Sequence, residues 1–258
     1  MDIRGEAYNL RRCMELKLRS ALAEGLRSVF ELGPCFRPED SPDNVHHPEF
    51  HMLELFECEL EYEGLLDLTR KLLCVAAENP ALEFEVVDVS DWLARNYDID
   101  VEQGGDSIRM QLVERGAVPF KFADKPAFEA INYVVGEYLE KGCGTKMRPA
   151  LLHRYPACTV CLARRDADRP SIIERFEVFV EGLEVANGFV DEICADNVSV
   201  RMIENGPCFT DEPFIKLLRS GGLPPSAGVG FGIERLLMAF GGVGPMSHLF
   251  HENQFGRL

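Results

Sequence analysis

The sequence predicts an α+β fold with a mainly antiparallel sheet flanked by helices. Strand-like segments gather toward both ends of the chain, helix-like segments lie between them, and no regular alternation of the two indicates βαβ units. No linker rich in Pro, Gly or Ser divides the chain, and 258 residues suit one large domain. We therefore expect a single domain over 1–258, with a looser helical insertion at about 81–145.

The first part of the chain predicts a helix followed by a hairpin. Residues 10–25 form the first expected helix, which ends at Gly25. Residues 28–36 follow as a strand, a polar loop covers 37–49, and a second strand runs over 50–62.

Alternation along 50-FHMLELF-56 assigns the side chains of the second strand to two faces. Leu53 and Leu55 share one face, and Met52, Glu54 and Phe56 share the other. A carboxylate among apolar side chains needs a partner, because burying an unpaired charge is costly. Glu54 therefore marks a place where the protein or a ligand must supply that partner.

The middle of the chain predicts helices. Residues 64–78 form an amphipathic helix that Asn79-Pro80 stops, and short helices are expected through 81–145. Asp124 is placed to cap one of them, with Pro126 in its first turn. The apolar side of the helix at 64–78 consists of Leu65, Leu68, Leu72 and Ala76.

Strands return at 149–190, where 181–182 reads Glu-Gly and predicts a two-residue hairpin turn. With that turn Phe179 lies opposite Glu184, and Glu177 shares the face of Phe179, so the two glutamates are diagonal neighbours. Carboxylates this close repel each other unless a proton or cation lies between them. Mg²⁺ with nucleotide phosphates is one such cation, and a solvated acidic face is the alternative.

The segment 223–242 predicts a loop, a Gly-rich strand and a helix. Within it, 228-GVGFGIERL-236 only superficially resembles a dinucleotide fingerprint, because the GxGxxG spacing is absent. A Gly-rich strand lets a ligand approach the backbone closely, and Arg235 at the start of the helix is placed to hold a terminal phosphate. Simple packing of the strand is the alternative.

The loop between the first two strands carries a second candidate for anion binding. Arg37 can bind an oxyanion through two nitrogens, Glu39 and His46 follow in the loop, and Phe50 offers a flat surface to an aromatic base. A solvated loop beside a core phenylalanine is the alternative.

The net charge weighs against nucleic acid as the main partner. The chain has 27 Lys and Arg against 43 Asp and Glu, a formal charge of −16, and no long basic run that would neutralise phosphates. No apolar run of about 18 residues predicts a membrane span, and the N-terminus has no apolar signal region. We expect a cytoplasmic protein.

The nine cysteines are scattered through predicted helices and strands, which favours reduced packing thiols over a disulfide framework. Cys158 and Cys161 have CxxC spacing, which is also found in zinc and redox sites. A structural zinc ion needs about four ligands, so Cys143 or a distant His would have to complete the site.

Together these segments resemble the catalytic domain of class II aminoacyl-tRNA synthetases, in particular the lysyl branch. The segment 29-VFELGPCFRPE…HHPEFHMLELF-56 resembles motif 2 of that class, and 228-GVGFGIERLLM-238 resembles motif 3. The segment 155–189 is similar to the lysyl type. The resemblance covers most of 13–62 and 147–241.

The resemblance implies roles at the matched positions. Arg37 would hold the ATP α-phosphate and the reacting carboxylate, and Glu39 would contact the adenine side. His46 and Arg235 would hold the outer phosphates, and Phe50 would stack on adenine. The resemblance further implies that Glu177 and Glu184 hold Mg²⁺, that Gly232 belongs to the ATP site, that Glu15 accepts the substrate α-amino group, and that the amino-acid pocket includes Glu54, Phe56, Asn187, Asp191 and Gly230.

The sequence also departs from the lysyl pattern. Phe56 stands where the family has a lysine-contacting Tyr, and Asp191 stands where lysyl enzymes have a Glu. These changes predict more room and one hydroxyl fewer, and so a longer, modified or differently placed amine in place of ordinary L-lysine. The partner of Glu54 is then a substrate ammonium group or, alternatively, a protein Arg or Lys.

The expected activity is ATP-dependent formation of an aminoacyl-adenylate. Neither the family's anticodon-binding barrel nor motif 1 is recognisable, so we expect transfer to a protein lysine, a carrier protein or a small amine, as in the lysyl paralog that modifies elongation factor P. A truncated tRNA-charging enzyme and an inactive binding paralog are the alternatives, and a homodimer is possible.

Overall fold

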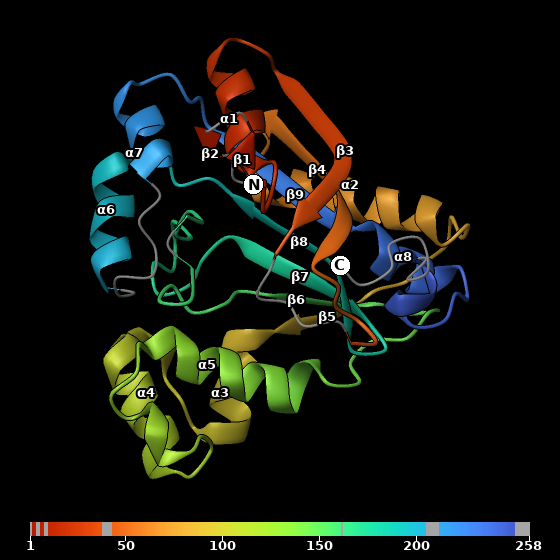
Figure 1. Cartoon of the computed structure of the whole chain (residues 1–258). Coiled ribbons are helices and arrows are strands. Elements are labelled where there is room, and N and C mark those ends of the chain that lie inside the picture. The colour runs from red at the N-terminus through yellow and green to blue at the C-terminus, as the bar shows by residue number, and fades with distance from the viewer. Residues whose placement is uncertain are drawn as a thin grey trace.

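The computed structural model describes residues 2–3, 6–7, 10–37, 43–160, 162–204 and 212–250. Its main feature is a seven-stranded sheet with the order β3-β4-β9-β8-β7-β6-β5 (Figure 1). Neighbouring strands run antiparallel except β5 and β6, which are parallel. The predicted α+β class with a mainly antiparallel sheet is therefore confirmed.

The first hairpin of the sheet begins with β3, Ser28–Phe36, which has the bounds that the sequence predicts. Strand β4, Glu49–Cys58, ends four residues before the predicted 62, because Glu59 has a φ of 57° and breaks the extended backbone. The predicted faces of β4 are correct, since Leu53 and Leu55 pack against the apolar core beneath the sheet.

The Gly-rich segment forms β9, Ser226–Gly232, which leads directly into α8, Ile233–Phe240, as predicted. Strand β9 lies between β4 and β8 at the centre of the sheet. A Cβ atom on Gly228 would lie 2.2 Å from Cε1 of Phe56. Glycine is therefore required there for the ring of Phe56 to lie flat on β9.

The second hairpin joins β7, Arg175–Val180, to β8, Leu183–Val190, through the predicted turn at Glu181 and Gly182. Both turn residues have positive φ, 53° and 77°, as a two-residue hairpin turn requires. Phe179 pairs with Glu184 as predicted, but a bulge then shifts the register, so that Glu177 lies opposite Asn187.

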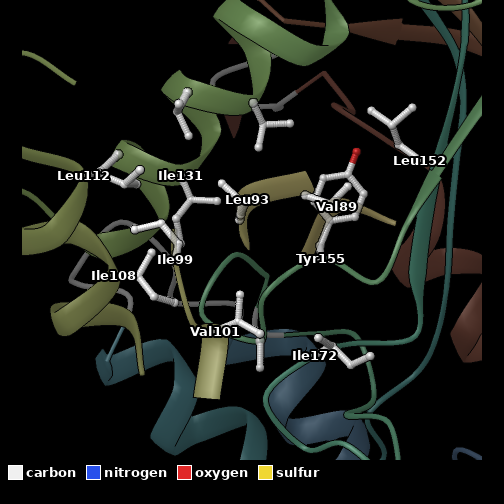
Figure 2. Close-up of a cluster of buried hydrophobic side chains, with 14 of the residues drawn as sticks. Val89, Leu93, Ile99, Val101, Ile108, Leu112, Ile131, Leu152, Tyr155 and Ile172 are labelled. Carbon is white, nitrogen blue, oxygen red and sulfur yellow. The ribbon is translucent and has the colours of Figure 1, made fainter. Parts of the chain in front are cut away.

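The helical region between the hairpins contains a strand that the sequence analysis missed, β5 (Glu85–Asp88), which is only four residues long. In Figure 1 the helices α3, α4 and α5 form a group below β5 and β6, and Figure 2 shows the apolar cluster that joins them to Leu152 and Tyr155. The predicted Asp124 cap is wrong, because Pro126 is the N-cap residue and no side chain caps this helix.

Three helices lie over the end of the sheet near β3 and β4. Helix α1, Glu15–Ala23, is shorter than the predicted 10–25, and it packs with α6 and α7, which the sequence analysis did not predict. The helices of the described ranges are all too short or too polar to cross a membrane.

The other elements are β1 Asp2–Ile3, β2 Glu6–Ala7, α2 Tyr62–Ala76, α3 Val89–Tyr97, α4 Gly105–Glu114, α5 Ala127–Val135, β6 Ala150–His153, α6 Ala195–Glu204, α7 Glu212–Arg219, three 3₁₀ turns (Val101–Gln103, Phe120–Phe122, Met246–His248) and a π-helical turn (Gly136–Glu140).

Replacing Gly228 by Ala tests the close approach of Phe56 to β9. We expect Gly228→Ala to lower the free energy of unfolding by about 1–3 kcal/mol, because the new methyl group displaces the ring. The matched control is Gly136→Ala, where the backbone is helical and the nearest atom would be 3.6 Å away. The control should gain up to about 1 kcal/mol. Equal urea midpoints for the two variants would contradict the packing described.

Candidate active site

A cavity of about 540 Å³ opens over β4, β9, β8 and β7, in the size range of small-molecule sites. The structure brings most of the predicted site residues together in its wall. They are Glu15, Arg37, His46, Phe50, Glu54, Phe56, Glu177, Glu184, Asn187, Gly230, Gly232 and Arg235. Of the remaining two, Glu39 lies outside the described residues, and Asp191 does not line the cavity.

One end of the cavity presents cationic and aromatic side chains. The guanidinium carbon of Arg37 lies 4.9 Å from the ring centre of Phe50, and within the described ranges Arg37 forms no ion pair. Arg235 reaches the same region from α8, and its Nη1 lies 3.3 Å from Oε2 of Glu184. His46 is held in place by Asp43, whose Oδ2 lies 2.9 Å from Nδ1 of His46. This end of the cavity is suited to phosphate groups.

Glu177 is a buried carboxylate with several donors around it. The hydroxyl of Tyr155 donates to its Oε2 at 2.7 Å, the amide of Asn187 donates to its Oε1 at 3.0 Å, and Arg175 forms an ion pair with it. The bulge in β8 matters here, because it places Asn187 opposite Glu177. Tyr155 thereby connects the apolar cluster of Figure 2 to the site.

Glu177 and Glu184 lie close enough to interact electrostatically. Burial raises the pKa of Glu177, and the negative charge of Glu184 acts in the same direction. Burial, with these two carboxylates nearby, also raises the pKa of Glu140 to about 8. The described residues contain no group of three or more side chains arranged to hold a metal ion. Mg²⁺ is commonly held by one or two carboxylates together with substrate phosphates, so this acidic pair fits such an ion.

Glu54 lies deeper in the cavity, with an exposed fraction of 2%. Its hydrogen-bond partner among the described residues is the backbone N–H of Met14, which donates to Oε2 at 2.8 Å; no Arg or Lys side chain is paired with it. Burial raises the pKa of Glu54 to about 7, and the nearby carboxylate of Glu15 acts in the same direction. Glu54 and Glu15 both line the cavity and together offer a negative site to a cation.

Asp191 is fully buried and already paired. Nε and Nη2 of Arg19 donate to its Oδ1 at 2.9 and 2.7 Å, and the hydroxyl of Ser226 donates to its Oδ2 at 2.8 Å. The third nitrogen of the same guanidinium, Nη1, donates to Glu15 at 2.7 Å. The room that a shorter acid at 191 was expected to leave is therefore taken by a side chain of the protein, which corrects that expectation.

Three aromatic rings enclose the guanidinium of Arg19. Its central carbon lies 4.6 Å from the ring centre of Phe56, 5.5 Å from that of Phe189 and 5.0 Å from that of Phe214. Burial alone would lower the pKa of Arg19, but the carboxylates of Asp191 and Glu15 raise it, so the group remains a cation.

The sequence analysis missed several residues that shape the site. Arg175 precedes Glu177 by two positions and so lies on the same strand face, which was a usable signal. Arg19 stands four residues after Glu15 and between the buried Leu18 and Leu22, an unusual place for a charge on a helix.

Glu234 was a further missed residue. Its carboxylate accepts the backbone N–H of His51 at 2.9 Å and contacts the ring of His51 at 2.8 Å. This contact fixes the start of β4 against α8, and no sequence pattern pointed to it.

The predicted zinc or redox site at the CxxC pair remains a prediction, because Cys161 lies outside the described residues. Cys143, its suggested partner, is half-buried, and burial raises the pKa of its thiol to about 12. A thiol with such a pKa is neutral at pH 7 and a poor metal ligand or nucleophile.

Comparisons with known proteins show which family and which relatives this chain is similar to. Residues 2–244 match the family described as tRNA synthetases class II (D, K and N). The lysine–tRNA ligase of Psychrobacter cryohalolentis is 30% identical over 256 residues, 89% of this chain and 49% of that protein. The lysine–tRNA ligase of Saccharolobus solfataricus is 30% identical over 262 residues, 90% of this chain and 51% of that protein. The chain thus spans about half the length of the curated relatives it matches.

The raised pKa of Glu54 predicts a pH-dependent stability. Its folded-state pKa of about 7 exceeds the ordinary value of 4.5. The stability tied to this carboxyl is therefore fully present below pH 4.5 and is lost as the pH rises through 7. Glu54→Gln removes this loss. The free energy of unfolding of the variant minus that of the unmodified protein should therefore be about 1 kcal/mol larger at pH 8.5 than at pH 6.

The control for this measurement is Glu31→Gln, at the position on β3 that pairs with Glu54. Hydrogen bonds from Lys17 and Arg11 lower the pKa of Glu31, so this carboxyl stays ionised throughout that pH range and its substitution should show no such trend. Urea titrations at the two pH values measure both variants. If the free energies of unfolding of Glu54→Gln and Glu31→Gln changed in the same way between the two pH values, the raised pKa of Glu54 would be contradicted.

Proposed function

The chain belongs to the class II tRNA synthetases of the D, K and N type, and from this premise we propose that it activates an amino acid with ATP, forming an aminoacyl-adenylate and pyrophosphate. The observation that carries the proposal is the cavity in which a cationic, aromatic end and a carboxylate-lined end adjoin. ATP fits the first end by its charge and its base. The ammonium group of an amino acid fits the second.

The proposed ATP site consists of residues from motif 2-like and motif 3-like segments. Arg37 would bind the α-phosphate and the reacting carboxylate, and His46 and Arg235 would bind the outer phosphates. Phe50 would stack on adenine, and Gly232 would let the nucleotide approach β9 closely. Glu39 keeps its expected role on the adenine side as part of the proposal.

Glu177 and Glu184 would hold Mg²⁺ together with phosphate oxygens of ATP. The ion supplies neutralisation of phosphate charge when it is bound. Arg175, Tyr155 and Asn187 hold the Glu177 carboxylate in one orientation, and this is the contribution of the chain itself.

The amino-acid end would use the two carboxylates that line the cavity. The α-ammonium group would bind between Glu15 and Glu54, which otherwise repel each other. Asn187 and the backbone at Gly230 would contact the rest of the substrate. The names of the relatives make lysine one candidate substrate.

The proposed chemistry is an in-line displacement at the α-phosphorus. A carboxylate oxygen of the amino acid forms a bond to that phosphorus, the bond to the bridging oxygen of the β-phosphate breaks, and pyrophosphate leaves with the electron pair. No general base is needed, because the carboxylate is already ionised at neutral pH. Positioning and charge neutralisation by Arg37 and Arg235 would supply most of the catalysis.

For the acceptor we propose a protein lysine, a carrier protein or a small amine. The formal charge of −16 supports this, because tRNA binding relies on basic surface. The second candidate is tRNA charging, which the names of the relatives favour. An inactive paralog is disfavoured, because a degraded site would lose charged groups that are costly to keep unpaired, and Arg37 is retained in the cavity wall without an ion pair among the described residues.

The exchange of labelled pyrophosphate into ATP, driven by a panel of amino acids, tests the activation step. We expect exchange with at least one of them, and Arg37→Ala should reduce it about 100-fold or more by removing charge stabilisation at the α-phosphate. The matched control is Arg95→Ala on α3, where the side chain is 78% exposed, and this variant should exchange normally. Absence of exchange with every amino acid would overturn the proposal.

Transfer of the labelled amino acid distinguishes the acceptors. The protein is incubated with ATP and the labelled amino acid in two separate mixtures, one with total tRNA and one with a tRNA-free protein extract. We expect label on protein or small amines in the second mixture and no label on tRNA in the first. Acid-precipitable label that ribonuclease removes would instead establish tRNA charging.

A further inference from the structure

The carboxylate of Asp191 lies at the base of a cage that suits an organic cation. The rings of Phe56, Phe189 and Phe214 surround the position in front of it, and aromatic faces attract cations just as a carboxylate does. In this protein the cation in the cage is the guanidinium of Arg19, which donates two hydrogen bonds to Oδ1 of Asp191. We call these four acidic and aromatic residues the cation cage.

No ligand can reach Asp191 while Arg19 occupies the cage. The side chains of Arg19 and Asp191 are 2% and 0% exposed, so the pair is closed to solvent. Neither residue lines the cavity, and the wall at this place consists of Phe56 and Phe189. A substrate side chain in the cavity therefore meets the aromatic rings, with the Arg19 cation directly behind them.

Five carboxylates of the described residues line the cavity, and only Glu15 and Glu54 lie at its cage end, where they can bind one substrate cation. Glu177, Glu184 and Glu234 lie at the other end, with Arg235 and His51. Glu15 and Glu54 line the cavity and fit the α-ammonium group, and Glu15 also anchors Arg19 through Nη1. An amine at the end of a long substrate side chain would face the rings and the apolar Val160 and Leu162, which also line the cavity. It would lose its water there without gaining a partner, and Arg19 would repel it.

We propose that Arg19 supplies, from within the chain, the cation that the cage holds, and that the amino acid activated here therefore has an uncharged, largely apolar side chain. This inference rests on the proposed activation reaction and names its substrate class. Arg19 is a specificity-determining residue that acts through the wall of the cavity and does not touch the reacting atoms.

Pyrophosphate exchange with amino acids matched in length tests the substrate class in the unmodified protein. L-Norleucine is compared with L-lysine and L-norvaline with L-ornithine, because each pair differs mainly in the terminal amine. The neutral member should have at least a tenfold higher kcat/KM, about the discrimination expected when a buried charge is left unpaired. A preference for L-lysine or L-ornithine would overturn the inference and leave amino-acid activation standing.

Arg19→Ala tests the cage without relying on activity. It should lower Tm by about 5 °C or more, because it leaves Asp191 unpaired. Millimolar N-ethylguanidine, which replaces the missing group, should recover part of that loss in Arg19→Ala. It should have no such effect on the unmodified protein or on Arg19→Ala/Asp191→Asn.

Where Arg19→Ala is active, its substrate preference gives a second test. The ratio of kcat/KM for L-lysine to kcat/KM for L-norleucine should be at least tenfold higher in Arg19→Ala than in the unmodified protein.

The results separate the two proposals. If no amino acid supports exchange, the activation proposal fails, and with it the assignment of a substrate class. Recovery of Tm by N-ethylguanidine then establishes the cage alone. A Tm of Arg19→Ala that N-ethylguanidine does not change, or an unaltered preference between L-lysine and L-norleucine, would overturn the role given to Arg19. If Arg19→Ala does not fold, the matched amino acids still decide the matter in the unmodified protein.

Discussion

The buried ion pair between Arg19 and Asp191 is the contact on which the arrangement of the site depends. It joins α1 to the end of β8, across 172 residues of sequence, and it fixes Glu15 through the same guanidinium. Breaking such a pair by removing one partner typically costs about 3–5 kcal/mol, because the other charge stays buried. Helix α1 is therefore held where Glu15 and the backbone N–H of Met14 face Glu54.

The central strands of the sheet determine the form of the cavity above them. Glycines at alternate positions of β9 leave its upper face without side chains, so that Phe56 lies flat on Gly228 and Met52 and Glu54 lie against Gly230. Gly232 then leads into α8, which carries Arg235 to the opposite end of the cavity. The site thus combines a rigid backbone surface with charged groups at its two ends, an arrangement suited to positioning two reactants.

The sequence predicted the parts of the structure that depend on local pattern. Alternation gave the two faces of β4, and the Glu181-Gly182 turn gave the β7–β8 hairpin. The resemblance to class II synthetases implied that Arg37, Phe50 and Arg235 share one site, and all three line the cavity. Long-range pairing was not predictable in this way. Nothing in the pattern indicated that Arg19 would meet Asp191, or that a bulge in β8 would place Asn187 opposite Glu177.

The most direct test of the account follows the oxygen atoms of the carboxylate. An amino acid that supports exchange is labelled with ¹⁸O in its carboxylate and incubated with ATP, the protein and hydroxylamine, which attacks the carbonyl carbon of an adenylate. The AMP released should then carry one ¹⁸O atom in its phosphate, as mass spectrometry would detect. Formation of ADP with ¹⁸O in inorganic phosphate, or AMP without label, would contradict attack of the carboxylate on the α-phosphorus.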